Sequence, residues 1–237
     1  MTGLKKKYDF LGGEVLLFDK DLEWTSFDLV QRVRNMLCRQ LGIKKMKVGH
    51  AGTLDPLATG LMILCTGKST RLIESFQEKE KEYLATLKLG ATTPSYDLET
   101  PEDSQKSFDH ITREDFEQVV QKYLGETDQV PPIFSAVKVN GKRAFDYARK
   151  GEELKLNSKK IVITDIAVES FELPYVTIRV VCSKGTYIRA LVRDIGNDLG
   201  AGAYLTKLRR LRIGEFDVSQ ALTVDYFTRN IELFVTS

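Results

Sequence analysis

The sequence has few of the residues that build covalent or metal-bound frameworks. Its 237 residues include three cysteines, two histidines and one tryptophan. Cys38, Cys65 and Cys182 are widely spaced and lie in apolar segments. They therefore indicate reduced core thiols, and not a disulfide framework or a zinc site. Because no cluster of side chains has the spacing of metal ligands, we expect neither a metal ion nor an organic cofactor.

Long apolar runs and linkers are also missing. The N-terminus, with Lys5, Lys6 and Lys7, lacks the apolar core of a signal peptide, and no apolar run approaches the roughly 20 residues that cross a bilayer. We therefore expect a cytoplasmic monomer, with no membrane contact and no obligate protein partner. We predict an N-terminal tail over residues 1–12 and a single α+β domain over residues 13–237.

The net charge is only +2, but its distribution along the chain is uneven. Residues 29–54 contain no acid and six bases: Arg32, Arg34, Arg39, Lys44, Lys45 and Lys47. Residues 184–214 contain seven bases against Asp194 and Asp198. Two such stretches on one face would suit a nucleic acid. An ordinary solvated surface is the alternative for either stretch alone.

A loop with the sequence HAGTLDPLATG, residues 50–60, follows the first basic stretch. Gly52 and Gly60 permit a positive φ or a close approach of another segment, while Pro56 fixes its own φ and favours an extended Asp55. Asp55 is the only acid of the loop, and the preceding bases attract anions. The alternative is a local role, because Asp commonly caps turns and helices.

Hydrophobic periodicity predicts the secondary structure around this loop. We expect strands at residues 14–18, 61–66, 81–90, 134–139, 161–173, 175–182 and 205–213. We expect helices from an N-cap at Ser26 to about Gly42, from 112 to 125, from 144 to 150, and from 186 to about 200. An exposed acidic loop is expected at 92–109, a tight turn at Asn140-Gly141, and a basic face on the strand at 205–213, where Leu and Arg alternate.

Residues 65–70, CTGKST, match the end of a phosphate-binding P-loop. The full pattern requires glycine at position 62, where this chain has Met62. Nucleotide hydrolysis is therefore disfavoured.

Two segments together resemble a known family. HAGTLDPLATG at 50–60 and CSKGTYIR at 182–189 are similar to the TruB-type family of tRNA pseudouridine(55) synthases, and the likeness extends from about Glu14 through Leu211. LGATTPSYDLE, SAVKVNGKRAFDYARKG and LRRL follow in the family's order. The resemblance implies a mixed, largely antiparallel central sheet flanked by helices and loops, and the T-arm of tRNA as substrate. No C-terminal RNA-binding PUA domain is recognised.

The resemblance also implies roles for individual residues. Asp55 matches the catalytic aspartate required to cleave the uridine N1–C1′ bond and rejoin the base through C5. Tyr83 matches the aromatic residue that stacks on the base, Arg189 the arginine paired with the aspartate, and Leu208 an apolar wall of the pocket. The supporting positions are His50, which matches the histidine packed where nucleotides flip out, and Asp97, Tyr187 and Lys20. We expect phosphate contacts from Arg32, Arg34, Lys44, Lys45, Lys47, Lys184, Arg209 and Arg210.

Two questions stay open at this stage. Asp55 could attack C1′, attack C6, or act as a base in an elimination route. The chain could also be a non-catalytic RNA-binding protein on the same scaffold, but the joint presence of Asp55, Tyr83 and Arg189 favours the enzyme.

Overall fold

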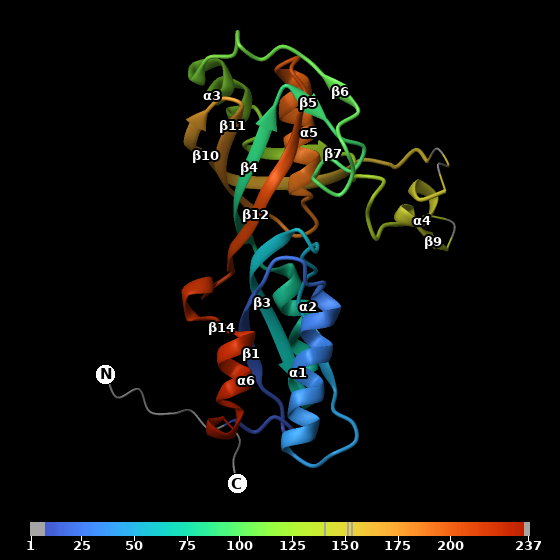
Figure 1. Ribbon diagram of the computed structural model, residues 1–237, viewed down its shortest axis with the longest axis vertical. Coiled ribbons are helices and arrows are strands. Elements are labelled where there is room, and N and C mark those ends of the chain that lie inside the picture. Colours follow the sequence, from blue (N-terminus) through green and yellow to red (C-terminus); the bar gives the residue numbers. More distant parts are fainter. Residues whose placement is uncertain (1–7, 140, 151, 153, 235–237) are drawn as a thin grey trace. The chain divides into compact units, whose positions relative to one another are not determined.

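The computed structural model describes residues 8–139, 141–150, 152 and 154–234. The chain divides into two compact units (Figure 1). Unit 1 comprises Met1–Lys81 and Arg209–Ser237, and unit 2 comprises Glu82–Leu208. Two strands, β4 (Lys81–Leu89) and β12 (Ala203–Ile213), contain the points at which the chain passes from one unit to the other.

Unit 1 is built on strands in the order β14-β1-β3-β12, with β2 beside β3 and β13 beside β12. Strand β1 runs antiparallel to β3, so that Lys20 lies opposite Gly60, and parallel to β14. The remaining bounds are β1 Val15–Lys20, β2 Val48–His50, β3 Ala58–Thr66, β13 Phe216–Asp217 and β14 Leu222–Thr223. The helices are α1 Ser26–Gln40, α2 Ile73–Glu78 and α6 Val224–Arg229, with 3-10 turns at Gly67–Leu72, Val218–Gln220 and Ile231–Leu233.

The N-cap of helix α1 lies one residue earlier than the sequence predicted. We expected Ser26 as the N-cap, but the N-cap is Thr25, whose side chain accepts from the Asp28 N–H. The Asp28 carboxylate accepts in return from the Thr25 N–H, which completes a capping box. Ser26 is the first helical residue, and its hydroxyl is available for contacts outside the helix.

Unit 2 is built on strands in the order β12-β4-β11-β10-β7. The long antiparallel pair β10 (Lys159–Glu172) and β11 (Tyr175–Cys182) continues to β7 (Gly125–Gln129), as the sequence predicted for the first two strands. Burial alternates along β4 from Lys81 to Leu89, which confirms a strand with one packed face. The other elements are β5 Ala91–Thr92, β6 Ser104–Gln105, α3 Arg113–Gln121, β8 Lys138–Val139, β9 Lys142–Arg143, α4 Ala144–Ala148 and α5 Ile188–Asp198.

The predicted fold class is confirmed, because the chain combines helices with a largely antiparallel sheet. Asn140 of the expected turn lies outside the described residues. Residues 8–12, expected as part of a tail, include the buried Phe10, whose ring stacks on Tyr8 and meets Phe227 edge-on. That the two units form one folding domain stays a prediction. Within the described ranges, no helix is long and apolar enough to cross a membrane.

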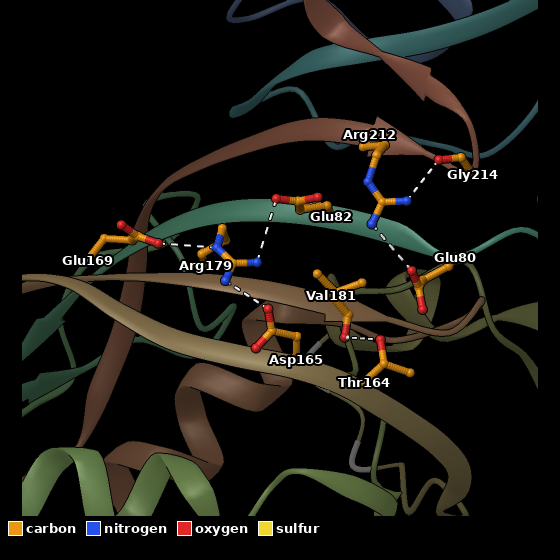
Figure 2. A network of polar contacts seen from close by, with 9 residues as sticks. All are labelled: Glu80, Glu82, Thr164, Asp165, Glu169, Arg179, Val181, Arg212 and Gly214. Carbon is orange, nitrogen blue, oxygen red and sulfur yellow. Dashed lines mark hydrogen bonds and ion pairs between the residues drawn. The ribbon is translucent and has the colours of Figure 1, made fainter.

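Figure 2 shows polar side chains that tie strands together within each unit. In unit 2 the Arg179 guanidinium forms ion pairs with Glu82, Asp165 and Glu169, at 3.7, 2.7 and 3.2 Å. The carboxylates raise the pKa of Arg179, which keeps it charged. In unit 1, the guanidinium of Arg212 in β12 forms an ion pair with the Glu80 carboxylate, at 3.3 Å.

Candidate active site

The loop that carries Asp55 connects β2 to β3 in unit 1, and Asp55 itself is half-buried. Just after the loop, β3 requires glycine at Gly60, where φ is +106° and an added Cβ would lie 2.2 Å from the Arg210 carbonyl oxygen. Strand β12 therefore lies directly against the start of β3. A hydrogen bond from the Ala58 N–H to the Asp55 carbonyl, 3.0 Å long, closes the turn that contains Pro56.

Ser26 holds the residue that precedes Asp55. Its hydroxyl accepts from the Leu54 N–H at 2.8 Å and donates to the Leu54 carbonyl at 2.9 Å. Ser26 is 3% exposed and Leu54 is 4% exposed, so water does not compete for these bonds. The start of α1 and the Asp55 loop are thereby joined through one side chain. Sequence analysis missed this role because it assigned Ser26 to the helix cap.

Arg210 supports the same loop from β12. It is 1% exposed, and its guanidinium donates to the Leu61, Gly52 and Thr53 carbonyls at 2.7, 3.3 and 3.4 Å. We had expected Arg210 to bind RNA phosphate as a surface residue. The structure corrects this expectation, because a buried guanidinium engaged by loop carbonyls supports the loop from within.

Lys20 brings a positive charge to the surroundings of Asp55. The Lys20 side chain is buried at the end of β1, and its Nζ donates to the Asp21 and Trp24 carbonyls at 2.9 and 2.7 Å. Burial lowers the pKa of Lys20 from 10.5 to about 8, while the charges of Asp21 and Asp55 act in the opposite direction. Asp55 is therefore close enough to act on the charge of Lys20.

His50 ends β2, immediately before the loop, and is half-buried. Burial lowers the pKa of His50, which favours the neutral imidazole. Its Nδ1 atom is buried and has no hydrogen-bond partner among the described residues. A buried nitrogen in this state remains available to a group that the protein itself does not supply.

The other predicted residues lie in unit 2, where Arg189 occupies the first turn of α5. Arg189 and Asp97 form an ion pair, with 3.4 Å between Nε and Oδ2, and both side chains are more than nine-tenths buried. The Arg189 guanidinium also donates to the Ser95 and Phe134 carbonyls, each at 3.1 Å. The structure thus brings Arg189 and Asp97 together, as their assignment to one site requires.

Three further predicted site residues also lie in unit 2. Tyr83 is buried at the start of β4, Leu208 is half-buried in β12, and Tyr187 is the N-cap of α5. The Tyr187 backbone bonds to the buried side chain of Gln129, which sequence analysis did not single out. No local sequence signal marks Gln129, because its partner lies 58 positions later.

The predicted phosphate contacts lie mainly on surfaces. Arg32, Lys44, Lys45 and Lys47 are exposed in unit 1 and Lys184 in unit 2, while Arg34 is half-buried. Arg34, Lys44 and Lys45 line a surface cavity of about 590 Å³ at the end of α1. Arg209 is half-exposed and forms a bidentate pair with the Asp19 carboxylate, at 3.0 and 2.7 Å. The Asp19 carboxylate thus partly neutralises the charge of Arg209.

Unit 1 therefore presents one acid, Asp55, on a loop that is bonded on both sides, with a buried cation nearby. Unit 2 presents a buried arginine–carboxylate pair at a helix start. A fixed carboxylate can act as a nucleophile or a base, and a buried arginine can hold an anionic group in place.

Comparison with known families gives matches over most of the chain. Residues 39–188 match the N-terminal domain of the TruB family of pseudouridylate synthases. Residues 189–236 match the C-terminal domain of tRNA pseudouridylate synthase B.

Individual proteins are similar over nearly their whole length. A Phocaeicola vulgatus protein named tRNA pseudouridine synthase B is 57% identical over 219 residues, which cover 92% of this chain and 93% of that protein. A protein of the same name from Flavobacterium johnsoniae is 47% identical over 225 residues, covering 94% and 98%.

Solved structures with a similar fold include larger chains. A chain in the crystal structure of a Cbf5-Nop10-Gar1 complex has a TM-score of 0.68 and 28% identity, covering 94% of this chain and 56% of that chain. A chain in an H/ACA RNP bound to a substrate RNA containing 2′-deoxyuridine has a TM-score of 0.66 and 26% identity, with the same coverage. This chain thus spans just over half the length of those two.

Proposed function

The chain belongs to the TruB family of pseudouridylate synthases and is an isomerase that converts uridine to pseudouridine in tRNA. On this premise we propose that its target is uridine 55 of the T-loop and that Asp55 is the catalytic aspartate. The reaction breaks the N1–C1′ bond and forms a C5–C1′ bond. The hydrogen on C5 leaves to solvent and N1 takes up a proton, so the RNA keeps its mass.

Asp55 acts as an ionised carboxylate at the uridine, by attack at C1′, attack at C6, or removal of a proton in an elimination route. The observation that carries this assignment is the way its loop is fixed. Ser26 bonds both backbone groups of Leu54, and Arg210 binds carbonyls on either side of Asp55. A reacting group gains from such fixed placement, since misplacement of about 1 Å can cost on the order of 100-fold in rate.

Tyr83 and Arg189 supply the other two contacts in the proposal. A base in a folded T-loop must be flipped out, at a cost of a few kcal/mol. Stacking on Tyr83 would return roughly 1 to 3 kcal/mol, the range for a base on an aromatic side chain. Arg189 would act as the arginine that the family pairs with its catalytic aspartate, and Leu208 would form an apolar wall beside the base.

The remaining residues assist binding. His50 would occupy the space left by flipped nucleotides, and Lys20, Asp97 and Tyr187 would hold the reacting groups in place. Phosphate contacts would come from the exposed bases Arg32, Lys44, Lys45, Lys47 and Lys184, with Arg34 and Arg209 at partly buried positions.

The test is release of tritium from T-arm RNA that is transcribed with 5-tritiated uridine. The wild-type protein should release about one equivalent per RNA, since a single uridine is the target, and Asp55→Asn should release none. Asp55→Asn must still bind the RNA, which a filter-binding assay checks. Release by Asp55→Asn at the wild-type rate would remove the role of Asp55, and release from a T-arm lacking uridine 55 would contradict the assigned target.

A further inference from the structure

The side chain of Gln129, the last residue of β7, forms two hydrogen bonds with the backbone of Tyr187. The Tyr187 N–H donates to its Oε1 at 2.8 Å, and its Nε2 donates to the Tyr187 carbonyl at 3.1 Å. Gln129 is 3% exposed. The carboxamide therefore pairs with Tyr187 as a peptide group pairs within an antiparallel ladder, and it fixes the Tyr187 backbone through both a donor and an acceptor.

The contact lies at the start of α5. Tyr187 is the N-cap of α5 and provides no side-chain cap, while its carbonyl accepts the first helical bond from the Leu191 N–H at 3.0 Å. Gln129 thus accepts from the N-cap N–H, as the N3 side chain of a capping box does locally. Arg189 follows two residues later, so the direction in which its side chain leaves the helix depends on this anchor.

The segment after Gln129 is bonded along the same helix. The Val130 carbonyl accepts from the Arg193 guanidinium at 3.0 Å, and the Phe134 carbonyl accepts from the Arg189 guanidinium at 3.1 Å. Residues 129–134 are therefore tied to the first two turns of α5 at three points. Gln129 contributes its side chain to this set of contacts, whereas the other two points are backbone carbonyls that no substitution removes.

We propose that Gln129 is a positioning residue for catalysis, which holds Tyr187 so that the Arg189 guanidinium is placed for its task. The inference rests on the proposed function, in which Arg189 is a residue of the active site. Both halves of the carboxamide are needed, because a side chain that only accepts loses the bond to the Tyr187 carbonyl, and an apolar side chain loses both bonds to the Tyr187 backbone.

The experiment compares Gln129→Leu and Gln129→Glu with the wild-type protein in single-turnover and steady-state tritium release. The control is Gln121→Leu, the same substitution at an exposed glutamine of unit 2, whose side chain donates to the Ile166 carbonyl at 3.4 Å. We expect both Gln129 variants to lose about 10- to 100-fold in kcat, with KM and RNA affinity unchanged. The control should keep the wild-type kcat. Rates are expressed per folded molecule, with the folded fraction taken from thermal melting.

A second readout reports on Arg189 directly. In protein labelled with nitrogen-15 arginine, the Arg189 Nε–H signal, identified by its loss in Arg189→Lys, should shift or broaden in Gln129→Leu and stay in place in Gln121→Leu. A wild-type kcat in the Gln129 variants overturns the inference, and so does a lowered kcat with an unchanged Arg189 signal. Release by Asp55→Asn in the same assay would instead mark failure of the proposed function, whatever the Gln129 variants do.

Discussion

The Ser26 hydroxyl forms two hydrogen bonds with the backbone of Leu54, the residue before Asp55. One buried oxygen thereby satisfies both the N–H and the carbonyl of that residue, so the path of the chain into Asp55 is fixed by the first residue of α1. The loop would otherwise be free to move, because loops in general have fewer packed contacts than the elements they join.

Replacing Ser26 by Ala should affect both stability and turnover. The buried Leu54 N–H and carbonyl lose their partner, and we expect the free energy of unfolding to fall by about 1 to 3 kcal/mol. Turnover should fall on the order of 10- to 100-fold, because Asp55 is less well placed. Urea unfolding and tritium release measure the two effects.

Thr25→Ala provides the matched control. It removes the capping hydroxyl of the same helix, one residue away, and should lower stability by about 1 kcal/mol. Turnover per folded molecule should stay at the wild-type value. Equal losses of turnover in Thr25→Ala and Ser26→Ala would mean that the helix start as a whole, and not the Leu54 contact, governs activity.

Arg210→Met should cost far more stability than the loss of an exposed arginine. It leaves the Leu61, Gly52 and Thr53 carbonyls without a buried donor, and we expect a loss of about 3 kcal/mol. The control is Arg229→Met, which removes an exposed pair with Asp225 worth roughly 0.5 kcal/mol. Similar unfolding free energies for the two variants would show that Arg210 does not support the loop.

The salt dependence of RNA binding should separate two predicted phosphate contacts. Lys45 is exposed in a cavity lined with bases, and Lys45→Gln should reduce the slope of log K against log salt by about 0.7 to 0.9. Arg209→Gln should change the slope less, because the Asp19 carboxylate already neutralises part of the Arg209 charge. Filter binding of T-arm RNA over a salt series measures both, and a larger effect for Arg209 would reverse the assignment.

Lys20 makes stability depend on pH in the alkaline range. Its pKa is about 8 in the folded chain and 10.5 without burial, so between these values the unfolded chain binds more protons. The contribution of Lys20 to the unfolding free energy is therefore least favourable below pH 8 and improves as the pH rises toward 10.5. Lys20→Met lacks this gain. Urea unfolding between pH 7.5 and 9.5 should show wild-type stability rising relative to Lys20→Met, and a constant difference would contradict the burial of a titrating amine.

Periodic patterns predicted the elements that are determined by local burial. The apolar run at 61–66 and the alternation from Lys81 to Leu89 were both strands in the structure. The position of Asp55 on a loop followed from its glycines and proline. These features depend on neighbours in the sequence, which a single chain reveals.

Contacts between distant segments were predicted less well. Alternating Leu and Arg in β12 suggested one basic face, but neighbouring strand residues point to opposite faces, so Arg209 reaches Asp19 while Arg210 turns inward to loop carbonyls. Which of two adjacent arginines is buried depends on acceptors about 150 positions away. The roles of Ser26 and Gln129 were missed for the same reason.

The support that Arg210 gives to the Asp55 loop has a consequence for the chain as it leaves the ribosome. Arg210 is 157 positions after Thr53, so the loop is synthesised long before the arginine that completes it. Since domains fold once their interacting parts have emerged, a nascent chain that stops before β12 carries Asp55 without its supporting guanidinium. Support of the Asp55 loop is thus deferred until β12 has emerged, and we expect products terminated before β12 to be inactive.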